Sequence, residues 1–156
     1  MPQTSIRSET ELGTVAERIR RLLKGSSNTI TIEGISVRLD RSTKGCTVKV
    51  GEKEIPCGAL SARDEDVAAL ADKVRAEVRV QRVTANLVAF RQIEFPVGKT
   101  MLERRYDVDG HSLVLSREPQ KQVQACVNSG PRLGVPSGIT NGRLRGVVEK
   151  ICSHMS

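Results

Sequence analysis

Residues 28–58 read NTITIEGISVRLDRSTKGCTVKVGEKEIPCG, and this segment contains the clearest strand pattern of the chain. Its apolar residues stand at every second position within each run, which is the spacing of a β-strand with one buried face. The parity of the apolar positions changes at Glu33-Gly34, at residues 42–45 and at Glu52-Lys53, and each place can form a turn. The segment therefore predicts a four-stranded antiparallel meander.

The three turns also predict which residues of neighbouring strands are paired. The expected pairs are Ile30–Val37 and Ile32–Ile35, then Arg41–Cys46, Leu39–Val48 and Val37–Val50, and finally Val50–Ile55 and Val48–Cys57. All three turns place one apolar set on the same face. That set is Ile30, Ile32, Ile35, Val37, Leu39, Cys46, Val48, Val50, Ile55 and Cys57.

The opposite face of the meander is polar. It places Arg38 opposite Lys49, and a like-charge pair of this kind needs a negative group nearby. Asp40 on the diagonal or a bound phosphate would supply the charge, and a simple solvated face is favoured over a phosphate contact.

Helices are expected on both sides of the meander. Ser8 and Glu11 form a capping box that starts a helix over residues 8–24, whose apolar residues recur at helical spacing. A second helix opens at residues 61–64 and continues to residue 78, with an apolar stripe that covers the buried face of the meander.

The second half of the chain is expected to hold about four more strands. Residues 83–95 alternate in a way that favours a strand, although a continued helix fits as well. Asp109-Gly110 predicts a hairpin within residues 101–117 that pairs Val108 with His111, and a further extended piece follows at residues 122–127.

The last part of the chain combines an irregular segment and a helix. Residues 128–142 are rich in Gly and Pro and are expected to lack regular structure. The final helix is capped by Thr140 or Asn141, and we expect a frayed tail after it. Its apolar face consists of Leu144, Val147, Val148 and Ile151.

The composition indicates a soluble α+β protein with an aliphatic core. The 156 residues include no Trp, one Tyr and two Phe, and 38% of them are apolar. A secretory leader, a long apolar run and a glycosylation sequon are not found, so we expect an intracellular protein, cytoplasmic or nuclear, that is not secreted and has no transmembrane segment. The four cysteines are too few for a disulfide scaffold. Cys46 and Cys57 are diagonal neighbours on the predicted apolar face, where a disulfide is conceivable, but buried reduced thiols are favoured.

Catalytic and metal-binding patterns are weak. The sequence has two histidines, and His111 has polar neighbours because it follows a turn. Cys152, His154 and Cys126 lack the paired spacing of a zinc site. No phosphate-binding glycine motif occurs. We therefore expect a protein that is not an enzyme and that uses no cofactor and no metal.

The positive charge is concentrated in the second half. The formal net charge is +7, and residues 79–156 hold 12 Lys and Arg against 6 Asp and Glu, whereas residues 1–78 hold 13 against 12. Arginine offers a planar fork that binds phosphate, so the candidate nucleic-acid-binding residues are arginines of this half. They are Arg79, Arg82, Arg104, Arg105, Arg132, Arg143 and Arg145.

We expect a compact domain over residues 1–156, with an N-terminal helix at 8–24 and two ββββα-like units at 28–78 and 83–153. This order is similar to the doubled ββββα arrangement of the Whirly and Pur-type nucleic-acid-binding proteins, which implies nucleic-acid binding. The leading part also resembles the element order of double-stranded-RNA-binding domains. Residues 62–66, however, read ARDED where that family has a lysine-rich start of the second helix, and this replacement argues against membership.

The expected function is non-enzymatic binding of nucleic acid, with RNA favoured, through phosphates and with little sequence specificity. The shortage of aromatic residues favours backbone recognition over base stacking. We expect a homo-oligomer, and a membrane surface is a less favoured partner. The alternative is a coat, matrix or scaffold subunit whose basic surface meets nucleic acid or membrane within an assembly.

Overall fold

The protein has an α+β fold with two four-stranded antiparallel sheets, as the sequence predicts. The computed structural model describes residues 14–25, 28–42, 45–58, 63–136 and 138–155. Contacts divide the chain into two compact units, Met1–Val78 and Arg79–Ser156. Helix α3, Asp64–Arg91, runs across this boundary and contributes buried residues to the core of each unit.

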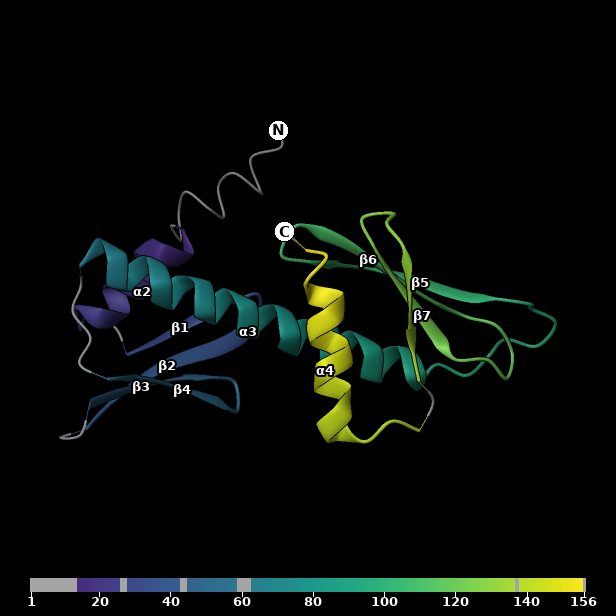
Figure 1. Ribbon diagram of the computed structural model, residues 1–156, viewed down its shortest axis with the longest axis horizontal. Helices are drawn as coiled ribbons and strands as arrows, with labels where there is room; N and C mark the ends of the chain where they lie inside the picture. The colour runs from purple at the N-terminus through teal and green to yellow at the C-terminus, as the bar shows by residue number, and fades with distance from the viewer. Residues whose placement is uncertain (1–13, 26–27, 43–44, 59–62, 137, 156) are drawn as a thin grey trace. The chain divides into compact units, whose positions relative to one another are not determined.

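The first sheet is the predicted meander. Its strands are β1 (Thr29–Ile32), β2 (Ile35–Ser42), β3 (Gly45–Val50) and β4 (Lys53–Gly58), and they are hydrogen-bonded in that order (Figure 1). The predicted pairing is confirmed for β1 with β2 and for β2 with β3, where Arg38 does lie opposite Lys49.

The predicted pairing of β3 with β4 is wrong by two residues. Val48, not Val50, lies opposite Ile55, and Val50 lies opposite Lys53. The chain turns earlier than expected because Gly51 adopts a φ of 59°, so that Gly51 and Glu52 form the two-residue connection. A shift of two residues preserves the side-chain parity, so the apolar face is still the predicted one.

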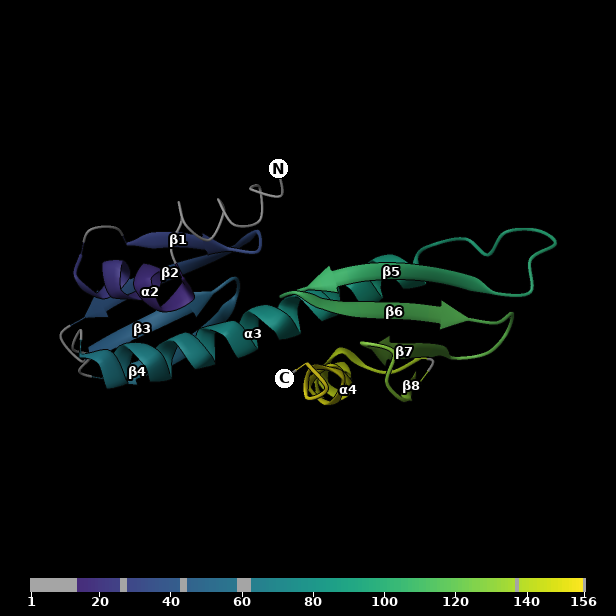
Figure 2. The same ribbon diagram turned by 90° about the horizontal axis from the view of Figure 1, so that it is seen from above.

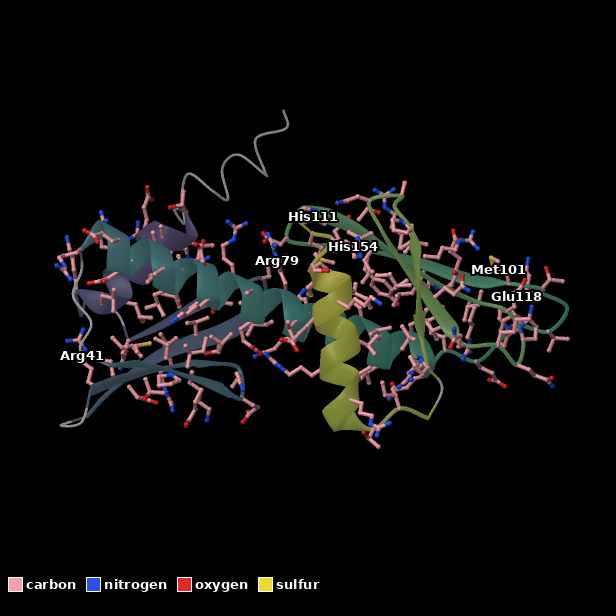
Figure 3. The ribbon with its side chains drawn as sticks, viewed as in Figure 1. Arg41, Arg79, Met101, His111, Glu118 and His154 are labelled. Carbon is pink, nitrogen blue, oxygen red and sulfur yellow. The ribbon has the colours of Figure 1, made fainter. Side chains whose placement is uncertain are left out.

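Helix α2, Val15–Leu23, packs on the apolar face of the first sheet. The predicted capping box at Ser8 and Glu11 lies outside the described residues, but Thr14 and Glu17 form one, with backbone-to-side-chain distances of 3.2 and 3.3 Å. Arg41 of β2 donates a hydrogen bond to the carbonyl of Leu23 and ties the sheet to the end of α2 (Figure 3).

The predicted strand at residues 83–95 is wrong, because α3 continues as a helix to Arg91. Val83, Leu87 and Phe90 are fully buried and follow helical spacing. Ala85 and Ala89, which completed the alternating pattern, are exposed.

The second sheet consists of β5 (Leu102–Val108), β6 (His111–Arg117), β7 (Val123–Val127) and β8 (Arg132–Val135), again in sequential order (Figure 2). The hairpin register with Val108 opposite His111 is confirmed. Both Asp109 and Gly110 have positive φ, 49° and 79°, as a type I′ turn requires. The extended piece predicted near residues 122–127 is confirmed as β7.

Strand β8 lies inside the Gly- and Pro-rich segment that was expected to be irregular, so that prediction is wrong for these residues. The prolines at 131 and 136 flank the strand without being part of it, and β8 is an edge strand. The missing amide hydrogens of proline therefore interrupt no pairing.

The final helix is confirmed as α4, Asn141–Cys152, with Thr140 at its N-cap. The frayed tail is a wrong prediction, because Met155 is only 1% exposed and its carbonyl accepts a hydrogen bond of 2.6 Å from Arg79. The last helical segment of each unit buries residues at the same spacing of four, three and four. In α3 these residues are Val67, Ala71, Val74 and Val78, and near the C-terminus they are Leu144, Val148, Ile151 and Met155. Among the described helices, none is both long and apolar enough to cross a bilayer.

Candidate nucleic-acid interface

The seven predicted arginines all belong to the second unit, but they lie on different elements. Arg79 and Arg82 are on α3, Arg104 and Arg105 on β5, Arg132 on β8, and Arg143 and Arg145 on α4. Their surroundings differ enough to separate arginines that hold the fold together from arginines that can contact a ligand.

Arg79 stabilises the fold. Its Nε atom is 2.7 Å from the Asp109 carboxylate, and the two side chains are 22% and 23% exposed (Figure 3). A second nitrogen donates to the carbonyl of Met155. Because these contacts join α3 to the β5–β6 turn and to the C-terminal end, we leave Arg79 out of the proposed interface.

Arg82 and Arg145 are half-buried. The Nε atom of Arg82 and the amide nitrogen of Asn86, one turn further along α3, are buried and have no hydrogen-bond partner among the described residues. Arg145 is already engaged in an interaction of its own. The guanidinium groups of both arginines are therefore less accessible to a ligand than those of exposed arginines.

Four of the predicted arginines are exposed. Arg104 donates a 2.8 Å hydrogen bond to the carbonyl of Glu103. In the part of the chain that the structure describes, the side chains of Arg105, Arg132 and Arg143 form neither a hydrogen bond nor an ion pair. Their guanidinium groups can therefore bind an anion without first losing a partner.

Arg105 and Arg132 lie on the open face of the second sheet, opposite the core. The register places them in one row with Val114 and Cys126, at the two ends of the row. With a strand spacing of about 4.8 Å, three steps separate their Cα atoms by about 14 Å. The pairing of four strands thus brings together residues that are distant in the sequence.

The local charge is not the same around these two arginines. Glu103 and Asp107 flank Arg105 on the same face of β5, so two carboxylates offset its charge. The cross-strand neighbours of Arg132 are neutral, namely Cys126 directly opposite and Gln124 on the diagonal. Of the arginines on the open face, Arg132 therefore carries the less compensated charge.

Arg143 lies in the first turn of α4, which contains no acidic residue. Helix N-termini favour anions through their free amides and their dipole, so the field of this turn has the same sign as the Arg143 charge. Arg132 and Arg143 are thus the two exposed predicted site residues whose side chains form no hydrogen bond or ion pair among the described residues and have no carboxylate among the cross-strand neighbours or in the first helical turn.

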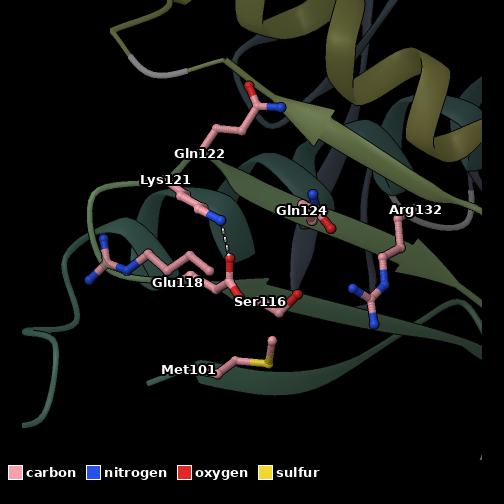
Figure 4. A pocket seen from close by; sticks show the side chains of 8 residues that line it. Met101, Ser116, Glu118, Lys121, Gln122, Gln124 and Arg132 are labelled. Atoms are coloured by element: carbon pink, nitrogen blue, oxygen red, sulfur yellow. Dashed lines mark ion pairs between the residues drawn. The ribbon is translucent and has the colours of Figure 1, made fainter. Parts of the chain in front are cut away.

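A groove of about 410 Å³ opens beside Arg132 on the second sheet (Figure 4). Its lining residues come from β6, β7, β8, the β6–β7 loop and the residue just before β5. They are Met101, Ser116, Arg117, Glu118, Lys121, Gln122, Gln124 and Arg132. Only Arg132 was a predicted site residue, because polar residues such as Ser116 and Gln124 carry no signal in a single sequence.

Glu118 and Lys121 form an ion pair of 2.9 Å at the groove. The hydrogen bond from Lys121, together with its charge, lowers the pKa of the Glu118 carboxyl. The same contact with Glu118 raises the pKa of the Lys121 ammonium. Both groups are therefore charged at neutral pH.

Two side chains of the groove wall have close neighbours. A Cβ atom on Gly134 would lie 2.5 Å from the amide nitrogen of Gln122, so glycine is what allows Gln122 to lie close against β8. Arg117 donates a 2.6 Å hydrogen bond to the carbonyl of Ile93, and its guanidinium carbon is 5.9 Å from the ring centres of Phe90 and of Phe95. Arg117 is therefore held in place, whereas Gln122 is exposed.

The aromatic residues offer no open stacking platform. Phe90 is fully buried, and Phe95 and Tyr106 are half-buried against the core of the second unit. This agrees with the expectation that bases are not stacked on exposed rings.

His111, the histidine considered for catalysis, takes part in hydrogen bonds between neighbouring strands and turns. The Nδ1 atom of His111 is 2.9 Å from the Asn128 amide nitrogen, and Asn128 also accepts a hydrogen bond from the Ser112 amide. Among the described residues, no group of three His, Cys, Asp or Glu side chains is arranged to hold a metal ion.

Comparisons with protein-family models, with curated proteins and with solved structures give no match to this chain. The similarity to Whirly and Pur-type proteins thus rests on element order alone.

Proposed function

We propose that the protein is a non-enzymatic nucleic-acid-binding protein that contacts phosphates with little sequence specificity, with RNA favoured and as a homo-oligomer. The observation that carries the proposal is the pair of exposed arginines, Arg132 and Arg143, whose side chains form no hydrogen bond or ion pair among the described residues. The cross-strand neighbours of Arg132 are neutral, and the first turn of α4 contains no acidic residue. They belong to a unit with 12 basic and 6 acidic residues.

The lack of exposed aromatic rings supports the mode of binding. Proteins that read unpaired bases use such rings, whereas backbone binding needs only cations and hydrogen-bond donors. Phosphate contacts carry no sequence information, so low specificity follows from the same surface.

The test is the salt dependence of binding to single-stranded RNA, double-stranded RNA and DNA. The slope of log affinity against log salt is about −0.7 to −0.9 per phosphate contact. The double variant Arg132→Gln, Arg143→Gln should therefore make the slope less negative by about 1.5. The matched control is Arg38→Gln, Arg63→Gln, which removes the same charge from arginines that are ion-paired with Asp40 and Asp66.

The control should bind like the unmodified protein. Equal losses in both double variants would show that only net charge matters and would remove Arg132 and Arg143 from the interface. No binding to any of the three nucleic acids at low salt would refute the proposed function.

The second candidate is a structural subunit of an assembly. It is favoured by β5, a seven-residue edge strand whose outer backbone groups have no neighbouring strand in its sheet. Such an edge can pair with the edge of another copy. Light scattering without nucleic acid decides between the candidates, since a large closed or polymeric particle favours the assembly subunit and a small oligomer favours the nucleic-acid-binding protein.

A further inference from the structure

We infer that the groove bordered by Arg132 is a phosphate-binding site. The inference rests on the proposed function to the extent that a nucleic-acid backbone is one source of the phosphate. A free phosphate or a phosphorylated small molecule is the other source, and both present the same oxyanion.

Hydrogen-bond donors from separate elements meet in the groove. Ser116 of β6 and Gln124 of β7 are directly paired across their strands, and Arg132 extends from the neighbouring β8. Lys121 and Gln122 reach the same groove from the β6–β7 loop. The groove is therefore lined by a hydroxyl, two amides and two cationic groups, all of which are able to donate hydrogen bonds to an oxyanion.

The charge of the groove is positive. Arg117, Lys121 and Arg132 line it, and Glu118 is the one acidic residue of the lining, so the formal charge is +2. Glu118 is already paired with Lys121 at 2.9 Å, which reduces its repulsion of an incoming anion. A phosphate monoester carries about −1.5 to −2 charges at neutral pH and is complementary to this balance.

The size of the groove suits a phosphate and the group attached to it. Its volume of about 410 Å³ falls within the usual range of small-ligand sites. Met101, which is 41% exposed, is its only fully apolar lining residue, so the groove offers little surface for a base. An oxyanion with a polar substituent is the ligand class that fits.

One cation of the wall is in place before a ligand arrives. Arg117 donates a 2.6 Å hydrogen bond to the carbonyl of Ile93. A charged group that needs no reorganisation attracts an anion at a lower entropic cost than one that must be ordered. The fixed charge of Arg117 therefore distinguishes this groove from scattered surface arginines.

Substitutions at Glu118 and Arg132 are expected to change the phosphate affinity in opposite directions. It is the carboxylate among the donors, so Glu118→Gln should strengthen phosphate binding, whereas Arg132→Gln should weaken it. Loss of one charge-assisted contact corresponds to roughly a tenfold loss of affinity. Removal of a partly neutralised carboxylate should produce roughly a threefold gain.

The experiment is an NMR titration of the full chain, labelled with nitrogen-15, with inorganic phosphate at constant ionic strength. Saturable shifts are expected for the side chains of Gln122, Gln124 and Arg132. The control is Arg38→Gln, which removes an exposed arginine of β2 that does not line the groove and should leave the phosphate affinity within twofold. Amide spectra before titration verify that each variant is folded.

The inference is overturned if Arg132→Gln binds phosphate as tightly as the unmodified chain, or if the shifts rise linearly and equally at all exposed arginines. It is also overturned if Glu118→Gln weakens binding.

A second arm, with an eight-nucleotide oligouridylate, separates this inference from the proposed function. Competition between the oligonucleotide and phosphate supports a backbone phosphate as the natural ligand. Phosphate binding without oligonucleotide binding supports the site, assigns it to a free phosphate or small phosphorylated molecule, and contradicts the proposed function. Oligonucleotide binding that depends on Arg143 but not on Arg132 refutes the groove and leaves the proposed function standing.

Discussion

Replacing Phe90 by alanine tests whether the second half of α3 is a helix that supports the second sheet. Phe90 is fully buried in the second core, and truncation of a buried phenylalanine costs about 3–5 kcal/mol of unfolding free energy. Arg117 lies 5.9 Å from the Phe90 ring centre, and loss of that cation–π contact adds about 0.5–1 kcal/mol. The total is a large share of the roughly 5–15 kcal/mol that stabilises a domain.

The assay is urea unfolding followed by tyrosine fluorescence. Tyr106 is the only tyrosine and the chain has no tryptophan, so the signal reports the second unit alone. The control is Val88→Ala on the same helix, where the side chain is 44% exposed and a change within about 0.5 kcal/mol is expected. On an alternating strand Phe90 would face away from Val83 and Leu87, so a loss below about 1 kcal/mol for Phe90→Ala would refute the helical packing.

Three further predictions concern single contacts. Arg79→Met should lower the unfolding free energy by about 1–3 kcal/mol, because it removes the ion pair with the partly buried Asp109, and an equal loss in the double variant Arg79→Met, Asp109→Asn would contradict this cause. Thr14→Ala should cost about 1 kcal/mol through loss of the helix cap, seen as faster amide hydrogen exchange in α2, and unchanged exchange would argue against the capping box. The pKa of Glu118 is lowered in the folded protein by its pair with Lys121. The stabilisation from this pair is therefore fully present above the unfolded pKa of 4.5, and it is lost as the pH falls through the folded pKa. The pKa of Lys121 is raised in the folded protein, so its contribution to folding stability is fully present below the unfolded pKa of 10.5 and is lost as the pH rises through the folded pKa. An NMR pH titration of the Glu118 carboxyl checks this, and a normal pKa there would show that the pair does not persist in solution.

Sequence patterns were sufficient wherever local chemistry alone decides the conformation. Side chains of a strand alternate with a period of two, so the apolar face of the first sheet followed from parity and survived even the wrong pairing of β3 with β4. The Asp109-Gly110 turn needs positive φ at two positions, and few residue pairs other than this allow it. The last helix was likewise readable from its own periodicity.

Tertiary packing decided the elements for which the sequence allowed two structures. The segment from residue 83 to 90 is built from Val, Ala and Leu among polar residues, which fit a strand or a helix, and the core that buries Phe90 selects the helix. Strand β8 forms between two prolines because the edge of β7 supplies its hydrogen bonds. No local pattern contains that information.

The candidate site shows the same division. Residue types alone identify a basic second half, its arginines as phosphate-binding candidates and a scarcity of aromatic side chains for stacking. Which arginine side chains are unpaired follows only from the folded chain, because the ion pair of Arg79 involves an aspartate 30 residues away. It also decided that Ser116, Gln124 and Arg132 border one groove, since strand register and not sequence distance makes them neighbours. Charge is a property of residue types, whereas its availability depends on distances that exist only once the chain is folded.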